Sequence, residues 1–250
     1  MGASQADLAL LRLLQLADSG FPSGAYTLSN GLETLVADGA IGNAEDLAAF
    51  VRVHLLAKFA RSDLIALLAA HDAGGEPTDA AAKDDQLDQA ARIVAIDRIV
   101  AIDRRLTAAK IAADDRIGSA RVGRRLATEV ARLAPSAFLS GFLNAIEHGR
   151  TAGNAAVAYG LAGRSLGVGS RQTALAASSA LVIGLGAAAV RLGLIGHGAA
   201  QRLVTEAAPD IAAAVDAAAR GQWTDLRPSA PQIEVALAVH ETAAARQFAT

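Results

Sequence analysis

The segment LLQLADSGFPSGAYTLSNGLE, residues 13–33, decides how the N-terminal part of the chain folds. It begins with the leucines of an expected helix, is interrupted over residues 18–24, and resumes at Ser29-Asn-Gly-Leu-Glu33. Glycine and proline break helices, so the middle is expected to be a turn. Ser29 is expected to cap a second helix over about 29–38, where Glu33 meets the positive end of the helix dipole. Such a turn between helices is typical of recognition surfaces.

The rest of the chain also favours helices. Alanine, the best helix former, dominates the 250 residues, and no run alternates with period two over the length of a strand. We expect an all-α, single-domain bundle of about ten helices over residues 1–250, with a flexible N-terminus (1–6) and C-terminal tail (221–250). Beyond residue 38, the helices are expected near residues 43–55, 62–73, 84–111, 115–133, 136–148, 154–166, 171–191 and 198–219.

Local signals define some of these helices more closely. Asn43 with Asp46 three residues later predicts a capping box, and Ser62 predicts another N-cap. The hexapeptide RIVAID occurs twice without change, at residues 92–97 and 98–103. Six residues rotate a helix by roughly 120° from the original face, so a tandem copy does not continue one apolar stripe. We therefore expect either a two-sided helix or a local irregularity there.

The charges are unevenly distributed. Residues 1–91 carry 5 basic and 13 acidic side chains, whereas residues 92–132 carry 10 basic and 5 acidic ones. This asymmetry predicts internal pairing, a charged docking face or solvated helix faces. With a net charge of −2 and no aromatic residues among the arginines, binding to nucleic acid is not expected. Residues 172–190 are uncharged but rich in Ala, Gly and Ser, so we expect a core helix and no membrane span.

Catalytic and cofactor signatures are weak. Gly184-Leu-Gly186 fits a loose dinucleotide-binding fingerprint, but its surroundings look helical. The five histidines are scattered, cysteine is absent, and no phosphate-loop pattern occurs. We therefore expect no enzyme activity, no cofactor and no metal site within this chain, although a site assembled from distant residues stays open. The alternative is a nucleotide-cofactor-binding enzyme that uses Gly184-Leu-Gly186.

The N-terminal segment resembles the signature of the UreF family of urease accessory proteins. The stretch DRRLTAAKIAADDRIGSARVGRRLA, residues 103–127, is similar to the central helical region of that family, and the ending HETAAARQF resembles its final segment. The resemblance implies an all-α cytoplasmic protein that forms a homodimer. It also implies a chaperone-like scaffold that bridges apo-urease bound to UreD (also called UreH) and the GTPase UreG during nickel insertion.

The residues that match the family motifs are the candidate partner-binding residues. They are Pro22, Gly24, Tyr26, Ser29, Gly31 and Glu33 in the first motif, Lys110 and Arg116 in the central one, and His240 and Glu241 in the last. Because they lie at a helix start and near a chain end, we expect Glu33→Ala and truncation before His240 to weaken assembly more than folding.

Overall fold

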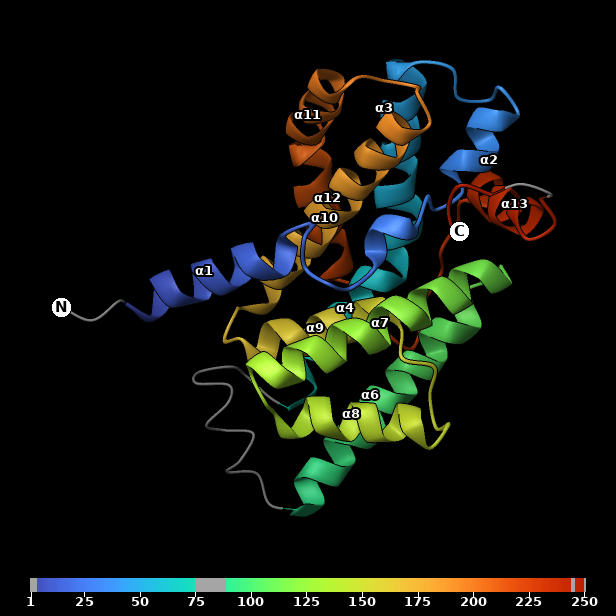
Figure 1. Cartoon of the computed structure of the whole chain (residues 1–250). Coiled ribbons are helices and arrows are strands. Elements are labelled where there is room, and N and C mark those ends of the chain that lie inside the picture. Colours follow the sequence, from blue (N-terminus) through green and yellow to red (C-terminus); the bar gives the residue numbers. More distant parts are fainter. Residues whose placement is uncertain (1–3, 75–88, 244–245, 250) are drawn as a thin grey trace.

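The computed structural model describes residues 4–74, 89–243 and 246–249 (Figure 1). Within these residues the chain is helical and has no strand, which confirms the expected all-α class. The α-helices are α1 (Gln5–Ala17), α2 (Leu32–Ala37), α3 (Ala44–Val53), α4 (Asp63–His71), α6 (Gln89–Ala109), α7 (Ala113–Leu133), α8 (Ala137–Glu147), α9 (Ala155–Ser165), α10 (Ser170–Arg191), α11 (His197–Glu206), α12 (Ala208–Ala218) and α13 (Pro231–His240). Four short helical turns complete the described helices: η1 (Ala25–Thr27), η2 (His54–Lys58), η3 (Phe59–Arg61) and η4 (Asp72–Gly74).

The buried helix α9 lies at the centre of the packing, between α4 and α7 (Figure 1). Small residues allow this close approach. Gly160 of α9 faces the carbonyl of Leu67 in α4, and Gly123 of α7 faces the backbone of residues 153–155. A Cβ at either glycine would overlap these backbone atoms. The glycine and alanine content therefore serves helix packing as well as helix formation.

Four expected details are corrected by the structure. Ser29 does not cap α2: the helix starts at Leu32, its N-cap is Gly31 in the left-handed conformation, and Ser29 is buried. Ser62 makes no capping bond either, because its Oγ donates to Lys58 O and Asp63 Oδ2. The expected helix over 198–219 is two helices, α11 and α12, which meet at Ala207. The beginning of the helix expected from residue 84 lies outside the described residues.

The N-cap expected at Asn43 is confirmed, but the capping box is not complete. Asn43 Oδ1 accepts bonds from the backbone N–H groups of Glu45 and Asp46 and so caps α3. In a capping box, the Asp46 carboxylate would accept from the backbone N–H of Asn43. Here Asp46 Oδ2 accepts instead from Gly42 N, one residue earlier. The uncharged stretch forms α10. Among the described helices, α10 is the one that is long and apolar enough to cross a membrane. Its most apolar part is 56% buried, as in a core helix.

The RIVAID repeat lies within α6, which continues through both copies without a break. The two copies have different surroundings. Ile93 and Val94 of the first copy are exposed, whereas the equivalent Ile99 and Val100 of the second are buried. The expected local irregularity is therefore absent from this helix. Because the two copies face different directions around the helix, equivalent residues differ in burial.

Candidate functional site

The turn between α1 and α2 is shaped by its own backbone. Asp18 Oδ1 accepts a 2.6 Å hydrogen bond from Gly20 N, which closes the first bend. Gly24, Asn30 and Gly31 have φ angles of 79°, 54° and 87°, in the left-handed region that favours glycine and asparagine. Gly31 also lies against α13, where an added Cβ would meet Ala236 and the carbonyl of Ile233. These are ordinary contact distances, so the left-handed φ of Gly31 is what favours glycine at the start of α2.

Three arginines from later helices hold this turn in place. Arg125 Nε donates to Pro22 O at 2.7 Å, and Arg121 Nη2 donates to Thr27 Oγ1 at 2.8 Å. Arg191 of α10 donates to the carbonyl of Tyr26 at 2.5 Å. The backbone of the turn is thus tied down, whereas the side chain of Tyr26 is 64% exposed.

The C-terminal segment reaches the same region through His240. The ring of His240 is 1% exposed and lies between two carboxylates, with Nε2 3.0 Å from Glu33 Oε2 and Nδ1 3.0 Å from Asp114 Oδ2. Its neighbour Glu241 accepts bonds from the N–H groups of Ala113, at 2.6 Å, and Asp114, at 3.4 Å. Glu241 therefore supplies the cap of α7, whose own N-cap residue is an alanine.

The last residues of the tail add further bonds to the turn. Gln247 N and Phe248 N donate to the two carboxylate oxygens of Glu33, and Ala249 N donates to Thr27 O. The ring of Phe248 is buried, and the guanidinium carbon of Arg191 lies over it, 4.1 Å from the centroid of the ring. The turn, the start of α2 and the C-terminal tail thus form one surface, which we call the turn–tail surface.

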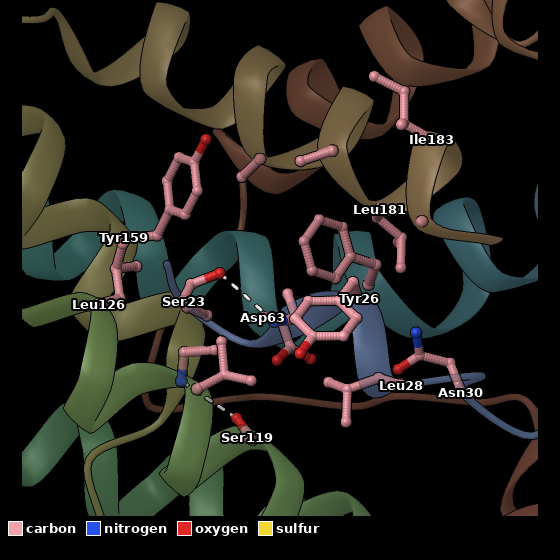
Figure 2. A pocket seen from close by; sticks show the side chains of 18 of the residues that line it. Ser23, Tyr26, Leu28, Asn30, Asp63, Ser119, Leu126, Tyr159, Leu181 and Ile183 are labelled. Atoms are coloured by element: carbon pink, nitrogen blue, oxygen red, sulfur yellow. Dashed lines mark hydrogen bonds between the residues drawn. The ribbon is translucent and has the colours of Figure 1, made fainter. Parts of the chain in front are cut away.

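A pocket of about 240 Å³, partly open to solvent, lies beneath the turn. Figure 2 shows the turn residues Ser23, Tyr26 and Leu28 around this space, together with Tyr159 of α9 and Leu181 of α10. Most of the lining is apolar, but one wall carries charges from two segments of the chain, residues 58–63 and 110–115. The lysines and carboxylates on this wall are Lys58, Asp63, Lys110 and Asp115.

These charges are paired with one another. Lys110 Nζ lies 3.0 Å from Asp63 Oδ1 and 3.0 Å from Asp115 Oδ1. Lys58 Nζ lies 3.0 Å from Asp115 Oδ2 and also contacts Glu234 of α13. Burial alone would lower the pKa of Lys110, but the charges of Asp115 and Asp63 outweigh it and raise that pKa. Likewise, burial opposes ionisation of Asp115, but the two lysines lower its pKa. The pairing of acidic and basic segments expected from the sequence is thus partly internal.

His54 borders the charged wall but takes no part in its pairing. It occupies the first position of η2, a single π-helical turn between α3 and η3. Its side chain is 3% exposed, and neither ring nitrogen has a hydrogen-bond partner. Burial, followed by the positive charge of Lys58, lowers the pKa of His54 from 6.5 to about 4. The imidazole is therefore neutral at pH 7.

The structure distributes the candidate residues between surface and interior. Pro22 and Tyr26 are exposed, and Gly24, Glu33, Arg116 and Glu241 are half-buried. Ser29, Gly31, Lys110 and His240 are buried. The structure brings Glu33 and His240 into direct contact and places Glu241 beside them. Lys110 belongs instead to the internal cluster, and Arg116 donates from Nη1 to Lys110 O and Ile111 O at the end of α6.

Sequence reasoning did not single out several residues that build these features. They are His54, Lys58, Asp63, Asp114, Asp115, Arg191, Glu234 and Arg246. No spacing along the chain signals their proximity, because the cluster combines residues that are more than 170 positions apart. Only the partial charge segregation of the sequence pointed to internal pairing.

The alternative cofactor site is corrected by the fold. Gly184 and Gly186 lie in the middle of α10 and not in a turn after a strand. Gly186 faces Ala200 of α11 at ordinary contact distance, which indicates a packing role, whereas nothing lies close to Gly184. A dinucleotide fingerprint requires a strand–turn–helix unit, and the described residues contain none. Nor do the described residues include a group of three His, Asp or Glu side chains placed to hold a metal ion.

The fold and the turn–tail surface define an all-α protein whose most elaborate feature is a surface assembled from both ends of the chain. The family model that matches is UreF, over residues 41–208. Urease accessory protein UreF of Yersinia enterocolitica (serotype O:8 / biotype 1B) is 28% identical over 241 residues, which cover 96% of this chain and 97% of the relative. Urease accessory protein UreF of Yersinia pestis (strain Pestoides F) is 27% identical over the same shares of each chain. The chain therefore belongs to the UreF family.

Proposed function

We propose that this chain is a urease assembly scaffold. It bridges apo-urease bound to UreD (UreH) and the GTPase UreG, so that nickel is incorporated into the urease active site. The relatives named urease accessory protein UreF support the general role. The observation that carries the proposal is the contact between Glu33 and His240, because it joins the turn and the tail into one partner-binding surface.

The turn–tail surface has the features of a protein interface. Tyr26 offers an exposed aromatic ring on a backbone that Arg191 holds in place. Aromatic residues on fixed loops make strong contacts because little conformational entropy is lost when a partner binds. Pro22 is exposed on the same turn. We assign direct contact to these two residues.

The buried candidates have a supporting role in this proposal. Ser29, Gly31 and His240 lie beneath the surface and fix the relative positions of α2 and α13. Glu33 and Glu241 hold the tail and the start of α7. Changes at these positions act on partner binding through the shape of the surface.

The chain acts in the cytoplasm, as a homodimer and without catalysis of its own in this proposal. Nickel is the cargo of the assembly and GTP is hydrolysed by UreG, so this chain needs no resident cofactor. Light scattering of the purified chain tests the dimer. Turnover of a substrate or of a nucleotide by the isolated chain would contradict the scaffold role.

The main experiment is co-purification with a UreD-like protein, a UreG-like GTPase and apo-urease from the same host. We expect a complex that contains all components and activates urease when nickel and GTP are added. Tyr26→Ala should weaken the complex by about tenfold or more with an unchanged melting temperature, since the ring is mostly exposed. Ile93→Ala, an exposed apolar residue on α6, is the matched control. A chain that stays alone with both partners present refutes the proposal.

A further inference from the structure

A second surface feature lies where α6 ends and α7 begins, next to the residues of α7 that the tail contacts. A groove there is lined by Arg104 of α6, Arg116 of α7 and Arg150 of the loop before α9. No carboxylate of the described residues lines it. The groove thus collects three guanidinium groups from three separate segments of the chain.

Two of these arginines are held in position before any partner arrives. Arg116 Nη1 donates to the carbonyls of Lys110 and Ile111, at 2.8 Å and 2.5 Å. Arg150 Nη2 lies 2.7 Å from Asp97 Oδ1, in a pair exposed to solvent. Exposed pairs of this kind contribute little to folding. A fixed guanidinium loses less side-chain entropy on binding than a free one, so both arginines are suited to recognition.

The positive charge of the groove is only partly compensated. Arg104 makes no ion pair or hydrogen bond with a side chain of the residues that the structure describes, and Arg116 bonds only to neutral carbonyls. Lys110, at the base of the groove, is neutralised from the inner side by Asp63 and Asp115. An anionic partner would therefore meet at least two guanidinium charges that lack a carboxylate.

The surroundings favour carboxylates of a protein over phosphate. Phosphate sites usually use free backbone N–H groups, often at a helix start. At this groove the first amides of α7 are occupied by Glu241, and those of Gly153 and Asn154 by Asp103. Exposed apolar side chains follow two of the lining residues in the sequence, since Ile111 after Lys110 and Ile117 after Arg116 are 72% and 64% exposed. Arginine beside exposed apolar residues is typical of protein interfaces.

We propose that this groove binds an acidic segment of a partner protein, whose carboxylates bond to Arg104, Arg116 and Arg150 while an apolar side chain packs on Ile111 or Ile117. The inference rests on the proposed scaffold function and adds a second docking surface to it.

The test compares Arg104→Glu with Arg202→Glu. Both residues are exposed arginines on helices and make no ion pair with another described residue, but Arg202 lies on α11 and does not line the groove. Binding of each variant to the purified UreD-like protein, the UreG-like GTPase and apo-urease is measured at about 50 mM and about 500 mM salt. We expect Arg104→Glu to weaken binding to one partner by about tenfold or more at low salt and less at high salt. Arg202→Glu should stay within about twofold, and Arg104→Lys, which keeps the charge but not the guanidinium, should bind more weakly than the wild type and more tightly than Arg104→Glu.

The outcomes separate this inference from the scaffold function. If Arg104→Glu binds every partner as the wild type does while the complex still assembles, the groove proposal is overturned and the scaffold function stands. If the wild type binds no partner, both are overturned. Displacement of the partner by micromolar inorganic pyrophosphate would also overturn the assignment, because it would identify a phosphate site. Restored binding between Arg104→Glu and a partner with a complementary carboxylate-to-lysine change would confirm the contact.

Discussion

Glu33 Oε2 lies 3.0 Å from His240 Nε2, although 207 residues separate the two side chains in the sequence. Glu33 also accepts the N–H groups of Gln247 and Phe248, so one carboxylate organises the whole C-terminal segment. His240 connects this carboxylate to Asp114 at the start of α7. The two ends of the chain are thus joined through a buried imidazole.

We expect Glu33→Ala to release the tail from the turn. The variant leaves His240 Nε2 and two backbone N–H groups without their acceptor, which costs about 1–3 kcal/mol for each group that stays buried. Urea unfolding should show a lower free energy of unfolding, and amide exchange should increase at residues 246–249. Glu45→Ala, at an exposed first-turn position of α3, should cost only a few tenths of a kcal/mol. Equal destabilisation by the two variants would contradict the role of Glu33.

Asp115→Asn should strongly destabilise the internal charge cluster. The change removes the negative charge that Lys58 and Lys110 share, so two buried ammonium groups lose much of their compensation. Breaking a buried pair in this way typically costs about 3–5 kcal/mol. Asp216→Asn removes a solvent-exposed pair with Arg171 and should cost less than about 1 kcal/mol. Chemical denaturation of both variants measures the difference, and similar values would show that the cluster is solvated.

His54 should make the folded state less stable as the pH falls from about 6.5 to about 4. Its pKa is lowered in the folded state, so the unfolded chain binds a proton first and the free energy of unfolding decreases through this range. A difference of one unit in pKa between the folded and unfolded states corresponds to 1.36 kcal/mol, so the full loss in free energy of unfolding is about 3 kcal/mol. We expect His54→Leu to flatten the pH dependence of stability in this window. An unchanged slope would mean that His54 is hydrated in the folded state.

Two glycine-to-alanine changes should have opposite effects on the stability of the folded chain. In Gly160→Ala, the new Cβ would overlap the backbone of Leu67, so α4 and α9 must separate and the melting temperature should fall by several degrees. In Gly184→Ala, nothing lies near the new Cβ, so the variant should gain about 0.5–1 kcal/mol from higher helix propensity. Calorimetry measures both. Destabilisation by Gly184→Ala would show that the space beside this glycine is needed.

Much of the helical framework was predictable from the sequence because its signals are local. Asn43 and Asp46 mark the start of α3 through contacts within four residues. Ser29 shows where local reasoning was wrong. A serine before an apolar run resembles an N-cap, but Asn30 and Gly31 adopt left-handed conformations and the helix starts at Leu32. The capping preference of serine, about 1 kcal/mol, therefore did not decide where the helix begins.

The candidate site was predictable only in part. The motifs pointed to Glu33 and His240 as separate residues, but neither motif predicted that they touch. Nothing in the sequence connected Lys58 with Glu234, which are 176 positions apart. Contacts of this kind depend on how helices pack, and many different packings satisfy the same helical periodicity.

The sequence by itself determined the all-α class, the turn after the first helix and the membership in the UreF family. Helices form through hydrogen bonds and side-chain contacts three or four residues apart, so their signals are written along the chain. Only the tertiary structure decided the joining of the turn to the tail, the buried charge cluster and the arginine groove. The two identical RIVAID copies show the reason: their residues are the same, yet Ile93 is exposed and Ile99 is buried, because burial depends on which helices lie against each face.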